Sequence, residues 1–233
     1  MFFGVRGGVK AAAATVLGSV ERLAQAAVAA VVGWALGFAS AWLTDYLQQQ
    51  DNLPLAHRGP LIRDLGVQAS SAVVWAGLAL TSDGPWWQWL AAGLIATPLL
   101  QVAVTDLRHR YVYTLVAAVG IAAGIALQWL VHGGEWWYGI VGALGGFVSF
   151  LIIWALGRLL YRGQEEPLAR GDITIATMVG ASAGPCTLSA LVYGVLVSGI
   201  FAIGVLIAKR SRHTFLPYGP GLCLGGLITL FRC

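Results

Sequence analysis

Long apolar stretches dominate this chain of 233 residues and restrict what it can fold into. Hydrophobic residues make up 58% of the chain, charged residues only 10%, and the mean hydropathy is +0.76. Soluble domains carry about 25% charged residues, so this composition excludes an ordinary soluble globule. We therefore expect an all-α fold, a polytopic bundle of transmembrane helices.

The apolar stretches are numerous enough for about eight spans, since one crossing needs about 20 apolar residues. The expected spans are 25–44, 65–80, 86–105, 111–131, 136–156, 172–184, 186–208 and 215–231. The sixth is short and contains glycine, which predicts a helix that is tilted, in a thin region, or packed inside the bundle. Residues 1–23 alternate charges with small and apolar residues, which indicates an interfacial helix before an integral membrane domain at 24–233. An additional span is the alternative for these N-terminal residues.

Basic residues give the orientation. Four connections carry lysine or arginine, at 58–63, 108–110, 158–170 and 209–212, whereas the connections 81–85 and 132–135 carry none. The positive-inside rule places the four basic connections in the cytoplasm and the tryptophan pairs at 86–87 and 136–137 in an outer aromatic belt. We expect a multi-pass protein of the cytoplasmic (inner) membrane, in contact with membrane lipid. The formal net charge of +4 follows this topology and does not indicate nucleic acid.

Two aspartates, Asp106 and Asp172, stand at the cytoplasmic mouths of apolar spans. A carboxylate at a membrane boundary is costly unless it is paired or hydrated, so both are candidate functional residues. The structural alternatives are that Asp172 caps a helix and that Asp106 pairs with Arg108 or Arg110. Two aspartates offer too few ligands for a divalent metal, so we expect neither a metal nor another cofactor.

The three cysteines of the chain, Cys186, Cys223 and Cys233, lie in or beside apolar spans. They show no paired ligand spacing, which indicates neither a disulfide framework nor a zinc site.

Three segments together resemble the aspartic (type IV) prepilin peptidase family: TDLRHRYVYT at 105–114, RGDITIATMVGASAG at 170–184 and LPYGPGLCLGG at 216–226. That family has an aspartate before a basic stretch, a later Gly-x-Gly-Asp-x-Lys motif, and Pro-Phe-Gly-Pro entering the last span. The matching positions are Asp106, Gly171, Asp172, Pro217, Gly219 and Pro220, and 31–40 is similar to the first span of the family. The chain has Ala169, Thr174 and Tyr113 where the family usually has glycine, lysine and proline. Residues 45–64 lack the cysteine pairs of bifunctional members, so the chain resembles a short form without N-methyltransferase activity.

The resemblance implies a membrane aspartic endopeptidase that removes the basic leader of prepilin-like, membrane-anchored proteins at the cytoplasmic face. Asp106 and Asp172 would be catalytic, one ionised to activate water and the other protonated to polarise the peptide carbonyl. Close like charges separate their pKa values and so create both forms; coupling of this kind requires carboxyl groups within roughly 4–8 Å. Gly171 would allow close approach of the substrate. The alternative is a catalytically inactive pseudo-peptidase, a scaffold or accessory subunit of a larger membrane complex.

Glu165 and Glu166 lie shortly before Asp172 in a predicted cytoplasmic loop, and a basic leader would be attracted to them; Asp45, Asp51 and Asp64 are the next candidates. We expect the double variant Glu165→Gln, Glu166→Gln to raise the KM for a basic leader, more at low than at high salt, because salt screens exposed charges. The kcat should change little. Cleavage kinetics at two ionic strengths measure this, and an unchanged KM at low salt would contradict the role of these glutamates.

Overall fold

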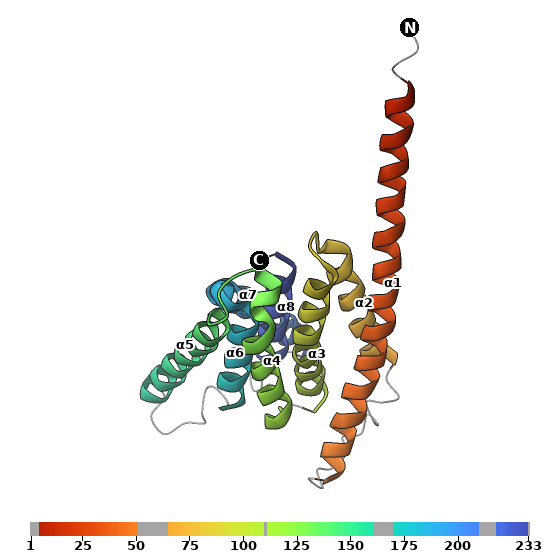
Figure 1. Cartoon of the computed structure of the whole chain (residues 1–233). Helices are drawn as coiled ribbons and strands as arrows, with labels where there is room; N and C mark the ends of the chain where they lie inside the picture. Colours follow the sequence, from red (N-terminus) through yellow and green to blue (C-terminus); the bar gives the residue numbers. More distant parts are fainter. Residues whose placement is uncertain (1–4, 51–64, 110, 161–169, 210–217, 233) are drawn as a thin grey trace.

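The computed structural model describes residues 5–50, 65–109, 111–160, 170–209 and 218–232, and these are helical apart from short connections. The α-helices are α1 (Val5–Gln50), α2 (Leu65–Thr81), α3 (Trp86–His109), α4 (Thr114–His132), α5 (Tyr138–Leu160), α6 (Arg170–Ala183), α7 (Thr187–Lys209) and α8 (Gly219–Arg232). A short 3-10 helix, η2 (Gly184–Cys186), joins α6 to α7. No strand occurs in the described residues, which confirms the all-α class (Figure 1).

Five segments are long and apolar enough to cross a membrane: Gly18–Gln50, Trp86–Arg108, Thr114–His132, Tyr138–Leu160 and Gly171–Gly204. The last of these runs from α6 through η2 into α7, and α2 is a shorter apolar helix of 17 residues. Seven of the helices begin and end close to the expected spans, whereas α1 is much longer than the expected span 25–44. The structure does not confirm eight crossings. The coarser conclusion holds: this is a multi-pass helical membrane protein.

The short helices α6 and α8 lie at the centre of the bundle. Each has 14 residues, which corresponds to about 21 Å of helix, less than the hydrocarbon thickness of about 30 Å. Ile175, Met178 and Val179 of α6 and Cys223 of α8 have no exposed surface. α6 contacts α4, α5, α7 and α8, and α8 contacts α3, α6 and α7. Of the alternatives for the sixth predicted span, packing inside the bundle is the one observed.

Helix α1 extends far beyond the rest of the bundle (Figure 1). Its 46 residues correspond to roughly 69 Å, which exceeds the full bilayer thickness of about 40–45 Å. The expected first span at 25–44 lies within this helix, and the residues before it continue the same helix without a break. The interfacial position of residues 1–23 stays a prediction.

A buried tryptophan joins the first three helices. Trp75 of α2 has no exposed surface, and a Cβ atom added to Gly33 of α1 or to Gly93 of α3 would lie 2.6 Å from its side chain. Its indole Nε1–H donates to Thr97 Oγ1 of α3 at 3.2 Å. The two glycines therefore leave the space in which Trp75 packs between α1 and α3.

Glycines also bring α5 and α6 into backbone contact. A Cβ atom at Gly142 or Gly146 of α5 would collide with the carbonyl oxygen of Gly180 or Ala176 on α6, whereas one at Gly145 would make only an ordinary contact with Thr187. Small residues allow such close helix approach in membranes. The dense packing expected from the glycines in apolar spans is thus present at Gly142 and Gly146.

Gly142→Ala should destabilise the protein by about 1–3 kcal/mol, because the added methyl group forces α5 away from α6. Gly199→Ala on α7 is the matched control, since a Cβ atom there has no neighbour within 4 Å among the described residues. Thermal unfolding in detergent measures both variants. An unchanged Tm for Gly142→Ala would contradict the close contact between the two helices.

Candidate active site

Asp106 lies near the end of α3, in its last turn, and only 9% of it is exposed. Thr105 beside it is 2% exposed and donates through Oγ1 to the carbonyl oxygen of Val102. A carboxylate buried at this depth needs polar or charged surroundings to stay ionised. The first turn of α8 supplies such surroundings.

The Asp106 carboxyl group lies against Gly219, the first residue of α8. A Cβ atom at Gly219 would collide with Asp106 Oδ2, would lie 3.0 Å from Asp106 Cγ, and would lie 2.8 Å from Ile175 Cδ1 of α6. The amides at a helix N-terminus carry partial positive charge, which stabilises a nearby carboxylate. The charge of Asp106 also acts on the buried thiol of Cys223, one turn further along α8.

The start of α8 is held in place by Ser198 of α7. Its hydroxyl group has two acceptors within reach, the carbonyl oxygen of Tyr218 at 3.1 Å and that of Gly194 on its own helix at 2.9 Å. The Leu222 backbone N–H donates to the same Tyr218 oxygen. A Cβ atom at Gly221 would collide with Ser198 Oγ. The Tyr-Gly-Pro-Gly sequence thus lets α7 and α3 approach the first turn of α8 closely. Sequence reasoning missed Ser198, although a serine in the middle of an apolar span is a visible signal.

Asp172 is the third residue of α6 as the structure bounds this helix, and it is half-buried. Ile175, which contacts the Gly219 position, lies one turn further along, and residues three apart share a helix face. Asp172 is therefore on the face of α6 that is directed toward the start of α8, where Asp106 lies. The capping alternative places an aspartate before the first turn, whereas Asp172 is within it.

The other family positions fall around these elements. Gly171, which precedes Asp172, is not closely packed, because an added Cβ atom would make only an ordinary contact of 3.8 Å with Val112 Cγ2. Thr174 is half-buried in α6. Tyr113, where the family usually has proline, is 6% exposed, precedes α4 in an extended conformation, and packs edge-to-face on Tyr111.

The described structure does not bring together the acidic residues that we expect to bind the leader. Glu165, Glu166, Asp51 and Asp64 lie outside the described residues. Asp45 is 5% exposed within the bundle, so it does not present an open acidic surface. Among the described residues, no three histidine, cysteine or acidic side chains form a group able to hold a metal ion.

One expectation about the cysteines was wrong. Cys186, at the end of η2, is disulfide-bonded, whereas Cys223 is free and buried. The spacing rule detects local cysteine pairs, and a single long-range bridge leaves no such pattern.

Gly219→Ala should lower cleavage of a leader peptide by at least about tenfold, because its methyl group displaces the Asp106 carboxyl group, and small displacements of reacting groups are costly. Gly226→Ala, two turns along α8, is the control, since its Cβ atom would make ordinary contacts of 3.4 Å. Specific activity, measured per amount of folded protein, separates a loss of catalysis from a loss of folding. Equal activity of the two variants would contradict a catalytic position for Asp106 at the start of α8.

Known proteins resemble this chain in sequence over a large part of its length. The model of the Type IV leader peptidase family matches residues 93–207, which include Asp106 and Asp172. A Type 4 prepilin-like proteins leader peptide-processing enzyme of Escherichia coli O78:H11 is 28% identical over 144 residues, covering 61% of this chain and 51% of the relative. A Prepilin leader peptidase/N-methyltransferase of Xanthomonas campestris pv. campestris is 27% identical over 191 residues, covering 76% and 60%.

The alignments span about half to three-fifths of the length of these two relatives. No solved structure matches the chain significantly. The family match, the two relatives and the motifs around Asp106 and Asp172 agree. Through residues 93–207, this chain belongs to the type IV leader peptidase family, the prepilin peptidases.

Proposed function

We propose that this protein is an aspartic endopeptidase that cleaves the basic leader of prepilin-like membrane proteins at the cytoplasmic face of the membrane. Asp106 and Asp172 are the proposed catalytic pair. Family membership supports the protease class and prepilin-like substrates. The residue roles rest on the geometry around the first turn of α8.

One observation carries the proposal: the buried carboxyl group of Asp106 and the side chain of Ile175 both lie against Gly219. Asp172 precedes Ile175 by one turn on the same face of α6. Segments 66 positions apart (172 − 106) thus converge on one helix start. In a chain with 10% charged residues, two carboxylates directed toward one place are a costly arrangement without a function.

The chemistry requires two protonation states. An ionised carboxylate accepts a proton from water, and the resulting nucleophile attacks the peptide carbonyl, while a protonated carboxyl group donates to the carbonyl oxygen. Asp172 lies in the first turn of α6, and Asp106 faces the first turn of α8, so a helix N-terminus stabilises charge at both positions. The ionisation steps therefore belong to the pair rather than to one assigned residue.

Two features of the opposite end support the cytoplasmic orientation. Trp86, Trp87, Trp136 and Trp137 are exposed there, as an outer aromatic belt requires. The disulfide-bonded Cys186 lies 14 residues after Asp172, about 21 Å away along α6 and η2. Disulfides persist in oxidising compartments and are rare in the cytoplasm, which supports the proposed cytoplasmic position of the end that carries Asp172.

Asp106→Asn and Asp172→Asn should each reduce leader cleavage by at least about 100-fold, because the proton transfer loses one partner. The measurement is cleavage of a pilin-type leader substrate in liposomes, with thermal unfolding as the check on folding. Asp83→Asn is the matched control, because Asp83 is at the other end of the bundle and 85% of its side chain is exposed.

Retained cleavage in either catalytic variant, with the control active, would contradict the assigned pair. A folded wild-type protein that cleaves no leader would instead support the alternative of an inactive pseudo-peptidase that serves as a scaffold or accessory subunit.

A further inference from the structure

Cys186 ends η2, at the end of the bundle opposite Asp106, and it is half-buried and disulfide-bonded. The chain has three cysteines, and Cys223 of α8 is free and buried. Cys233 is therefore the one remaining partner within the chain. It lies outside the described residues, and it follows Arg232, the last residue of α8. The positions of η2 and of this helix end therefore decide whether the two cysteines can meet.

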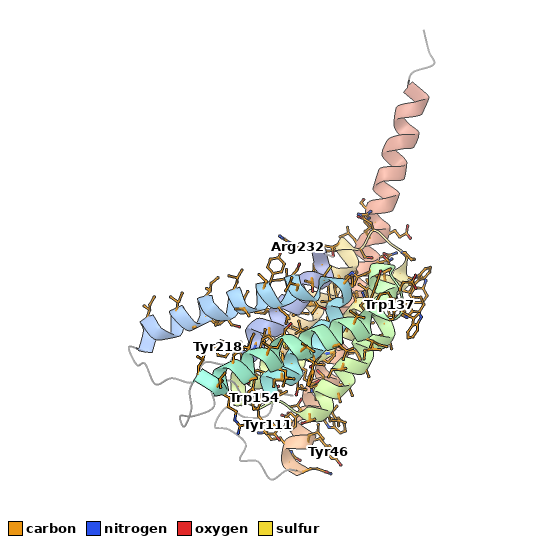
Figure 2. The ribbon with its side chains drawn as sticks, turned by 90° about the vertical axis from the view of Figure 1, so that its left-hand side faces the viewer. Tyr46, Tyr111, Trp137, Trp154, Tyr218 and Arg232 are labelled. Atoms are coloured by element: carbon orange, nitrogen blue, oxygen red, sulfur yellow. The ribbon has the colours of Figure 1, made fainter. Side chains whose placement is uncertain are left out.

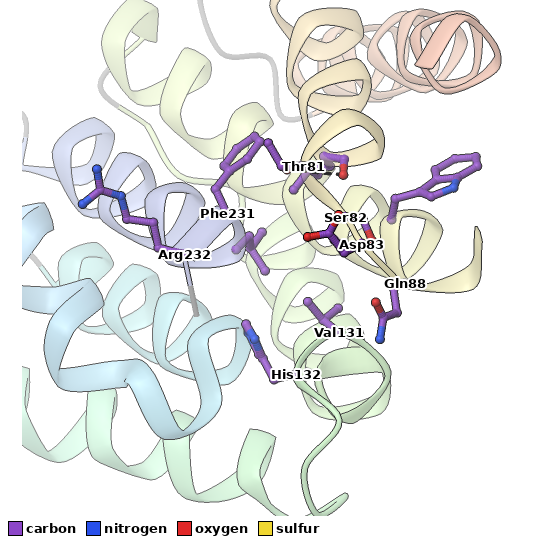
Figure 3. A pocket seen from close by; sticks show the side chains of 12 residues that line it. Thr81, Ser82, Asp83, Gln88, Val131, His132, Phe231 and Arg232 are labelled. Carbon is purple, nitrogen blue, oxygen red and sulfur yellow. Dashed lines mark hydrogen bonds between the residues drawn. The ribbon is translucent and has the colours of Figure 1, made fainter. Parts of the chain in front are cut away.

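The end of α8 and η2 both lie against the last two turns of α4. A cavity of about 250 Å³ is lined by His132, the last residue of α4, and by Leu230 and Phe231 of α8 (Figure 3). One turn earlier on α4, Gln128 lies against η2, because a Cβ atom at Gly184 would be 2.5 Å from the Gln128 Cδ atom. Two adjoining turns of one helix thus place η2 and the end of α8 near each other.

Helices α6 and α8 run side by side in the same direction. Near their starts, a Cβ atom at Gly219 of α8 would lie 2.8 Å from Ile175 Cδ1 of α6. Further along, a Cβ atom at Gly226 would lie 3.4 Å from both methyl carbons of Val179. The two cysteines each follow this second contact by seven residues (186 − 179 and 233 − 226). Equal spacing beyond a shared contact predicts one level for both cysteines, and a disulfide needs Cα atoms about 4.4–6.8 Å apart.

The other ends of the same two helices form the candidate active site. Asp172 lies in the first turn of α6, and Gly219, the first residue of α8, lies against Asp106. Figure 2 shows Tyr218 and Arg232 at the two ends of α8. Each helix has 14 residues and is only about 21 Å long, so a shift at its outer end also moves the end at the site.

We propose that Cys186 and Cys233 form a disulfide that holds the outer ends of α6 and α8 together, and that leader cleavage depends on this bridge. In the oxidised protein the two helices keep one relative position, so Asp172 and Asp106 keep theirs. Reduction breaks the bridge and allows the two helix starts to separate, and small displacements of reacting groups are costly. The effect on cleavage rests on the proposed function, whereas the bridge itself does not.

Thiol–disulfide exchange forms and breaks the bridge. Each of the two thiols loses one proton and one electron as the sulfur–sulfur bond forms, and an external disulfide accepts both electrons and both protons to become two thiols. The half-buried Cys186 is accessible to such a reagent, whereas Cys223 has no exposed surface. The exchange is therefore confined to the outer end, which the proposed orientation exposes to an oxidising compartment.

The bridge is identified by peptide mapping of the full-length, detergent-solubilised protein, purified without reductant. Free thiols are blocked with N-ethylmaleimide in denaturant, the protein is digested without reductant, and the peptides are analysed by mass spectrometry. We expect a linked pair of peptides that contain Cys186 and Cys233, and a blocked Cys223. Unlinked Cys186, or Cys186 linked to Cys223 or to a second copy of the chain, would overturn the bridge.

Reduction of the wild type with dithiothreitol, Cys186→Ser and Cys233→Ser should have the same effect, since each removes the same bond. We expect the Tm to fall by about 5 °C or more, because a disulfide restricts the unfolded chain between its ends. The kcat for leader cleavage should fall at least about fivefold with little change in KM, because the reacting groups move and the substrate contacts do not. Cys186→Ser treated with dithiothreitol is the matched control, and the reductant should change it no further.

A mapped bridge whose reduction leaves both the Tm and cleavage unchanged would overturn its role in holding α6 to α8. A lower Tm with an unchanged kcat would overturn the dependence of cleavage on the bridge. An oxidised wild type that cleaves no leader would contradict the proposed function instead, and the peptide map and the Tm would still decide the bridge.

Discussion

The fold depends on helices that approach one another to backbone contact. Lipid tails are as apolar as leucine, so burial of apolar side chains does not drive helices together inside a bilayer, and close packing must do so. Gly142 with Gly180 joins α5 to α6, and Gly225 brings α8 against Ala190 and Gly194 of α7. These contacts hold two short helices, α6 and α8, at the centre of the bundle. The position of Asp106 against Gly219 follows from the same packing.

The sequence predicted where the helices lie better than how they relate to the membrane. Apolar stretches located all eight α-helices of the described residues, because charged and glycine-rich connections separate them clearly. The number of crossings could not be predicted, because a helix surrounded by other helices is as apolar as one that meets lipid. Helices α6 and α8 are of this kind, and their 14 residues reflect the bundle rather than the bilayer.

The proposed site residues can be recognised in the sequence, whereas the contacts that support them cannot. Asp106 and Asp172 are conspicuous because carboxylates are rare in this chain. The contacts that support them join segments that are distant in sequence, so no local pattern predicts them. These contacts are Gly219 with Ile175 and Ser198 with the Tyr218 carbonyl oxygen. The bridge at Cys186 was missed for the same reason.

The packing of Trp75 has a consequence for how this sequence can change over evolutionary time. Its ring occupies the space left by two absent side chains, at Gly33 and Gly93 on different helices. A larger residue at either glycine is compatible with the fold only if position 75 becomes smaller, and a smaller residue at 75 leaves a cavity unless a glycine is replaced. The three positions must therefore vary together. In an alignment of homologues they would appear as one co-varying set, which links α1, α2 and α3 by inheritance as well as by contact.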